Sequence, residues 1–212
     1  MSPQLEATNQ IIGESSGIEQ MRRRIGRYAL EQADAFGEDA TPRWRATVSA
    51  RIPARIDPEK WPDTYGLVLT AVNATTGEPV LFTRDSGVAV VDALAASCSS
   101  GFAYRIGKEF FIDGGYRTNA DNADLAAGYA QVVVLSPFGG RTRTPERWGV
   151  TLARQVADLE AHGSRVRTIF PNAETEALFG GNMMDVSKRP AVARAGFAHA
   201  EQLVPELNEF WG

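Results

Sequence analysis

The triplet Asp113-Gly114-Gly115 has the residue types for acid–base chemistry. It ends an apolar run, and a segment rich in Asn and Asp follows it. A carboxylate half-buried at the end of a strand can have its pKa raised towards the working pH, which suits a general base. The two glycines allow a tight turn and the close approach of another backbone. Because Asp-Gly is also a common turn dipeptide, the local pattern leaves a plain turn as the alternative.

A base of this kind needs a nucleophile, and the literal G-x-S-x-G at residues 13–17 offers Ser15. A nucleophile elbow requires a buried strand before it and a helix after it. The preceding residues contain only two consecutive apolar side chains, Ile11 and Ile12. Ser16 and Glu19 also fit a capping box that opens the following helix. We favour the capping box and keep Ser15 as the alternative nucleophile.

Cys98 is the single cysteine, so an internal disulfide is excluded and a reducing, cytoplasmic compartment is expected. A free cysteine is most often a small buried hydrophobe, although a thiol nucleophile is the other interpretation. The two histidines, His162 and His199, lie late in the chain on expected helix surfaces. No serine or acid pattern surrounds them, which argues against a Ser-His-Asp triad.

Composition and missing motifs exclude several classes of protein. The net charge is −4, so no nucleic-acid partner is expected, and no Lys/Arg block marks a membrane patch. No phosphate-binding loop, dinucleotide fingerprint, HExxH motif or Cys/His cluster is present, so we expect no cofactor and no metal. The segment "NADNAD" lacks the glycine and distal glutamate of a calcium loop. No apolar run approaches the length of a membrane-spanning helix.

Hydrophobic spacing and turn signals predict the elements that must position Asp113. The 3.6-residue periodicity predicts a helix over residues 18–36. Two β-hairpins are expected over residues 67–83 and 102–113, with a helix over 87–97 between them. The apolar face of the first helix comprises Ile18, Met21, Ile25, Ala29, Ala33 and Phe36.

The second half of the chain alternates strand and helix patterns. The continuous apolar run at residues 131–136 predicts a strand buried on both faces, as in a parallel sheet. Thr144-Pro145 is expected to open a helix that Gly163 ends. A short strand over 164–171 and a last helix capped by Ser187 follow. The expected apolar face of the middle helix comprises Trp148, Leu152, Val156 and Leu159. Together these patterns predict an α/β fold with a mostly parallel sheet flanked by helices.

Residues 84–137 resemble the second half of bacterial patatin-like phospholipases. The similar features occur in order: "RDSG", a helix ending in "AAS", a hairpin, "DGG", an Asn-rich turn, "ADLAAG" and a strand ending in "SP". A weaker resemblance extends over about residues 20–212. The resemblance implies a three-layer patatin-like fold that forms one domain over residues 1–212.

The resemblance also implies a serine acyl hydrolase that uses a Ser-Asp dyad and no histidine. In this chain Asp113 matches the proton-accepting aspartate, and Gly114 and Gly115 complete its motif. The expected substrate is a lipid or acyl ester, with peripheral membrane contact and no cofactor. The part that carries the glycine-rich oxyanion loop and the elbow is expected to be missing at the N-terminus. We therefore expect a partner or a second copy to cover the incomplete sheet.

Two other functions remain open at this point. A chain without its oxyanion loop could be a non-catalytic remnant of the fold or a binding module. A thiol-dependent hydrolase that uses Cys98 is the third alternative.

Overall fold

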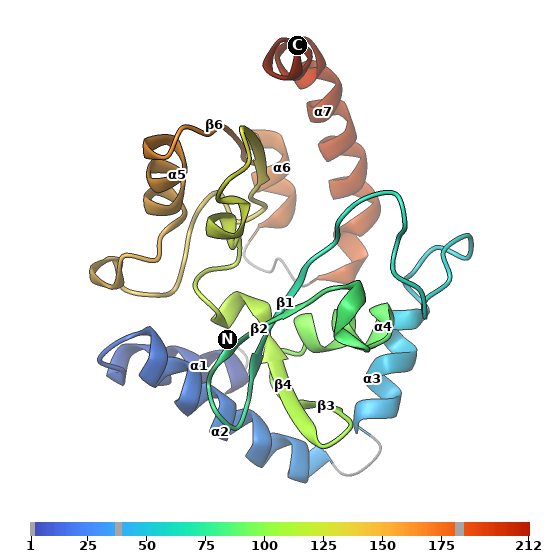
Figure 1. Ribbon diagram of the computed structural model, residues 1–212, viewed down its shortest axis with the longest axis vertical. Coiled ribbons are helices and arrows are strands. Elements are labelled where there is room, and N and C mark those ends of the chain that lie inside the picture. Colours follow the sequence, from blue (N-terminus) through green and yellow to red (C-terminus); the bar gives the residue numbers. More distant parts are fainter. Residues whose placement is uncertain (1–2, 37–39, 181–184) are drawn as a thin grey trace. The chain divides into compact units, whose positions relative to one another are not determined.

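A computed structural model of the chain describes residues 3–36, 40–180 and 185–212. The protein is a mixed α/β structure with a small antiparallel sheet and a two-stranded parallel sheet (Figure 1). Contacts between residues divide it into two compact units. The first comprises residues 1–122 and 142–151, and the second comprises residues 123–141 and 152–212. The expectation of a single domain stays a prediction, because two compact units can belong to one domain.

Four antiparallel strands form the sheet of the first unit, in the order β2-β1-β4-β3. β1 (Leu69–Asn73) pairs with β2 (Pro79–Phe82) across a short turn. β3 (Tyr104–Ile106) and β4 (Glu109–Asp113) form the second hairpin, and β4 also pairs with β1. Both hairpins were predicted from the sequence and are confirmed.

Helices pack against both faces of this sheet (Figure 1). α1 (Pro3–Glu14) and α2 (Ile18–Phe36) cover one face, while α3 (Ala40–Ser49) and α4 (Val90–Ser97) cover the other. Side chains alternate along each strand, so neighbouring residues of β1 and β4 enter opposite cores. The α2-side core contains Ile12, Met21, Ile25, Ala29, Val72, Ala74, Ala103, Ile112 and Tyr116. The α4-side core contains Val48, Ala71, Phe82, Val91, Ala93, Ala95, Ala96, Tyr104 and Phe111.

In the second unit, β5 (Gln131–Leu135) pairs in parallel with β6 (Arg165–Ile169). α5 (Leu152–Ala161) precedes β6, and α6 (Ala173–Phe179) and α7 (Arg189–Trp211) follow it. The core of this unit contains Ala123, Val132, Val134, Leu152 and Leu159. In the part of the chain that the structure describes, no helix is both long and apolar enough to cross a bilayer.

The prediction of a mostly parallel sheet was wrong for the described residues. Among their strand pairings, only β5–β6 is parallel. The first four strands are joined within hairpins by short turns, which permit only antiparallel neighbours. β5 is also buried on one face only, since Val132 and Val134 point into the core while Leu135 is exposed.

The prediction that Thr144-Pro145 opens the middle helix was wrong as well. Pro145 caps a single 3₁₀ turn, Glu146–Trp148, which ends at Gly149 in the left-handed conformation, with φ 67°. α5 begins only at Leu152, and Trp148 packs against the α2-side core instead of lying on α5. Ser187 does not cap the last helix, because it lies in a short 3₁₀ turn that Asp185 caps.

The helix over residues 18–36 is confirmed with the same limits. Met21, Ile25 and Ala29 are buried, and the side chain of Phe36 lies outside the described residues. α3, which was not predicted from the sequence, begins at Ala40.

Candidate functional site

Asp113 is the last residue of β4, where it pairs with Ala71 of β1. Phe111, two residues earlier on the same strand, belongs to the α4-side core. Residues two apart on a strand share a face, so the Asp113 side chain lies on the face that α4 covers. Its backbone N–H donates to the carbonyl of Ser99 at 2.9 Å, which attaches the strand end to the segment that follows α4.

The two glycines make the turn after Asp113 possible. The Asp113 carboxylate caps a 3₁₀ turn, Gly114–Tyr116, by accepting a hydrogen bond from the Gly115 N–H at 2.8 Å. Gly114 is buried against β1, and a Cβ at this position would lie 2.1 Å from the Oγ1 of Thr70. Such a separation is not allowed, so only glycine fits without movement of the strand. The expected close approach of a second backbone is therefore present at Gly114.

Burial raises the pKa of the Asp113 carboxyl above its ordinary value of 3.8. The hydrogen bond from Gly115 and the positive charge of Arg143 act in the opposite direction and lower the pKa of this carboxyl. Among the described residues, no ion pair to Asp113 is formed. The carboxylate is thus half-buried and unpaired at the end of a strand, as a general base would need.

Cys98 lies close enough to Asp113 for the two side chains to interact electrostatically. Cys98 caps the C-terminal end of α4 and is exposed as a whole. Desolvation is nevertheless the largest cause that raises the pKa of its thiol; the negative charge of Asp113 adds to this effect, and Arg51 opposes it. A raised pKa disfavours the thiolate, which is the reactive form of cysteine. This environment argues against Cys98 as a nucleophile.

Ser15 lies at a corner between two helices, not between a strand and a helix. α1 ends at Glu14, and α2 begins at Ile18. The side chain of Ser15 is buried, and its Oγ donates to the carbonyl of Ile11 at 2.6 Å. An elbow presents its serine on a strained turn with the oxygen exposed, so this geometry does not suit a nucleophile.

The capping box predicted between Ser16 and Glu19 was wrong, because Ser16 bonds to Gln20 instead. The Ser16 N–H donates to the Gln20 side chain at 2.7 Å, and the Ser16 hydroxyl donates to the same oxygen at 3.2 Å. Glu19 lies in the first turn of α2, where a carboxylate still complements the helix dipole.

The Asn-rich segment after the glycines is a hydrogen-bonded turn. Asn119 accepts from the N–H groups of Asp121 and Asn122 at 2.8 and 2.9 Å, and its amide donates to the carbonyl of Val150 at 2.6 Å. Asn122 has φ 50°, a left-handed conformation that asparagine tolerates, and its amide donates to the carbonyl of Gly114 at 3.2 Å. This segment therefore holds the glycine turn in place.

Arg143 is a site residue that the sequence did not indicate. It is exposed, and its guanidinium donates to Thr8 and Asn9 of α1 at 2.8 and 3.1 Å. It also lies over the ring of Tyr116, 5.8 Å from the ring centroid. Arg143 is thirty positions after Asp113, and no local pattern links the two.

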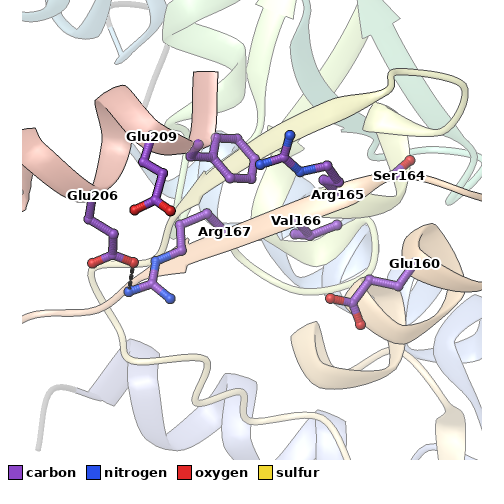
Figure 2. A pocket seen from close by; sticks show the side chains of 8 residues that line it. Glu160, Ser164, Arg165, Val166, Arg167, Glu206 and Glu209 are labelled. Carbon is purple, nitrogen blue, oxygen red and sulfur yellow. Dashed lines mark ion pairs between the residues drawn. The ribbon is translucent and has the colours of Figure 1, made fainter. Parts of the chain in front are cut away.

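An open groove of about 570 Å³ lies in the second unit (Figure 2). Arg165 stacks over the ring of Phe210, 5.1 Å from its centroid, and Arg167 forms an ion pair with Glu206. Ser164 borders the groove, but its Oγ donates to the carbonyl of Tyr129 at 2.7 Å. The groove contains none of the site residues predicted from the sequence.

Of the two histidines expected on helix surfaces, only His199 lies on a helix, and His162 lies in the turn after α5. His162 follows α5, is exposed, and hydrogen-bonds through Nδ1 to the Asp158 carbonyl at 2.6 Å. His199 lies on α7 and is partly exposed. In the described ranges, no group of three or more metal-ligating side chains comes together.

Comparison with known proteins gives no match, either among protein-family models or among curated proteins. The resemblance of residues 84–137 to patatin-like phospholipases therefore stays a prediction.

Proposed function

We propose that this chain is a cytoplasmic, patatin-like acyl hydrolase with a three-layer fold, in which Asp113 accepts the proton of a serine hydroxyl. The proposal rests on the environment of the Asp113 carboxylate at the end of β4. This carboxylate is half-buried, without an ion pair among the described residues, and its pKa is raised by burial. The substrate would be a lipid or acyl ester, met by peripheral contact with a membrane.

The proposed reaction has two steps. The serine Oγ attacks the ester carbonyl while its proton passes to the Asp113 carboxylate, and the ester bond breaks to release an alcohol that takes the proton. Asp113 then accepts a proton from water while the water oxygen attacks the acyl carbonyl. The bond between the acyl carbon and the serine Oγ breaks, that proton passes from Asp113 to Oγ, and the carboxylic acid is released. No cofactor takes part. Because Ser15 is buried and hydrogen-bonded to Ile11, the proposal needs a different hydroxyl at Asp113.

A non-catalytic remnant or binding module is the second candidate function. The helix-to-helix setting of Ser15 favours it, because the elbow and its oxyanion loop are not formed by the described residues around that serine.

Hydrolysis of a short-chain p-nitrophenyl ester, combined with labelling by a fluorophosphonate probe, distinguishes the two candidates. The hydrolase predicts turnover and a covalent adduct on one serine, both lost in Asp113→Asn and both retained in the exposed control Asp85→Asn. Absence of any serine adduct on this chain would support the non-catalytic function. Turnover that persists in Cys98→Ser would remove the thiol-dependent alternative.

A further inference from the structure

α7 (Arg189–Trp211) has two distinct faces. One face is wholly or partly buried and follows the ordinary helical spacing. Its residues are Val192, Ala195, His199, Leu203, Glu206, Leu207 and Phe210. On this face Glu206 pairs with Arg167, and the ring of Phe210 lies under Arg165, both within the second unit.

A neighbouring face carries large apolar side chains that are exposed. Phe197 is 68% exposed, Val204 49% and Trp211 54%. Ala193 and Ala200 lie between them on the same face and are also exposed. The outer face of a surface helix is normally polar, so the packing of this unit does not explain the stripe.

The spacing of the stripe is that of a coiled-coil seam. Phe197, Val204 and Trp211 repeat every seven residues, at the positions called a in a heptad, and the d positions hold Ala193, Ala200 and the partly buried Leu207. Small residues at d let two helix backbones approach closely, so that each large a residue can fill the space opposite an alanine.

The charges beside the seam fit an antiparallel pair of identical helices. Arg194 and Glu201 occupy successive e positions, and both are exposed. In an antiparallel pair, a residues face d residues and e residues face e residues. If Phe197 faces Ala200 of the second copy, Arg194 faces Glu201 of that copy. The two-fold axis repeats the same pair in the other direction.

We propose that α7 pairs antiparallel with α7 of a second copy of this chain, through Phe197, Val204 and Ala200. The proposal concerns the second unit alone and is independent of Asp113 chemistry. A membrane is the other surface that an apolar helix face could contact. The helix contains two arginines and three glutamates and no lysine, which does not favour an anionic bilayer.

The oligomeric state tests the proposal directly. Sedimentation equilibrium of the full chain at about 10–100 μM should show a monomer–dimer equilibrium, the range expected for a short helical interface. Phe197→Glu and Val204→Glu should each yield a monomer. The control Tyr129→Glu, which changes another exposed side chain of the same unit, should leave the dimer intact. A wild-type monomer, or a dimer that survives Phe197→Glu, would overturn the proposal.

Charge exchange tests the orientation of the two helices. Arg194→Glu alone places two pairs of like charges in the interface and should raise the dimer dissociation constant about tenfold. The double variant Arg194→Glu, Glu201→Arg should restore it. Circular dichroism of each variant confirms that α7 is still formed. If the two substitutions weaken the dimer additively in the double variant, the antiparallel register is wrong. If monomeric protein binds phosphatidylserine vesicles, the apolar face contacts a membrane and not a second copy of α7.

Discussion

Gly114 lies so close to Thr70 that the two residues leave no room for a side chain between β1 and the turn after β4. A Cβ at Gly114 would be 2.1 Å from the Thr70 Oγ1 and 2.2 Å from its carbonyl oxygen. The contact fixes the position of the glycine turn, and that turn presents the N–H group to which the Asp113 carboxylate is bound. The orientation of the candidate base thus depends on a residue that has no side chain.

Gly114→Ala should destabilise the protein by about 1–3 kcal/mol, because the added methyl group displaces strand β1 or the turn. Gly115→Ala is the matched control. Its Cβ would lie 3.1 Å from the Asp113 Oδ1 and 3.7 Å from Ala120, so a small adjustment accommodates it. Urea denaturation of both variants measures the difference. Equal stability of the two would contradict the close approach at Thr70.

Asp113→Asn should stabilise the protein increasingly as the pH rises above about 3.8, the ordinary pKa of the carboxyl. The folded pKa is raised, so the native state binds the proton more tightly than the unfolded state and loses stability as the carboxyl ionises. Below that pH both states are protonated and the effect vanishes. Asparagine keeps the oxygen that accepts from Gly115 but cannot ionise. Denaturation of wild type and variant at a series of pH values measures this trend, and a stability difference that does not change with pH would contradict the raised pKa.

Arg143→Gln should raise the pKa of Asp113 further above its ordinary value. Burial already raises this pKa, and the positive charge of Arg143 is one of the two opposing effects. A carbon-13 NMR titration of the Asp113 carboxyl measures the shift directly. Arg147→Gln, an exposed arginine in the same segment, serves as the control. If both variants leave the titration unchanged, Arg143 does not act on the site.

Alkylation of Cys98 should become faster near neutral pH in Asp113→Asn. The negative charge of Asp113 contributes to the raised pKa of the thiol, so its removal increases the thiolate fraction at a given pH. The rate of reaction with iodoacetamide as a function of pH reports the thiol pKa. Superimposable profiles for wild type and variant would show that the two groups do not interact.

Tyr104→Phe should cost about 1–3 kcal/mol of stability, because it removes a buried hydrogen bond to a carboxylate. The Tyr104 hydroxyl donates to Asp92 at 2.6 Å, and Arg45 donates to the same carboxylate oxygen at 2.9 Å. Thermal unfolding should show no comparable loss for Tyr65→Phe, since that side chain is exposed. An equal loss in both variants would argue against this hydrogen-bond network.

Local patterns predicted the local elements well. The 18–36 helix, both hairpins and the helix between them follow from spacing and turn residues that act over a few positions. The arrangement of strands into sheets could not be predicted in this way, because the order of strands and helices along the chain does not determine which strands pair. Pairing of β4 with β1, for example, joins segments about forty residues apart.

The candidate site was predictable only in part for the same reason. The segment "FFIDGG" predicted that Asp113 ends a strand and that glycine follows it for a tight turn. The roles of Thr70 and Arg143 could not, since each approaches the turn from a distant part of the chain. The G-x-S-x-G motif at Ser15 shows the opposite case. Its sequence matches a nucleophile elbow, but it lies between two helices.

The chain leaves the first unit after Asn122 and returns to it for residues 142–151 before leaving again. During synthesis, the hydrogen bond from the Asn119 amide to the Val150 carbonyl can therefore form only after Val150 has left the ribosome. A stop codon placed after residue 122 would remove that acceptor together with Trp148, which packs in the α2-side core. Expression of the first unit by itself therefore requires a chain that retains residues 142–151, which a truncation after residue 122 removes.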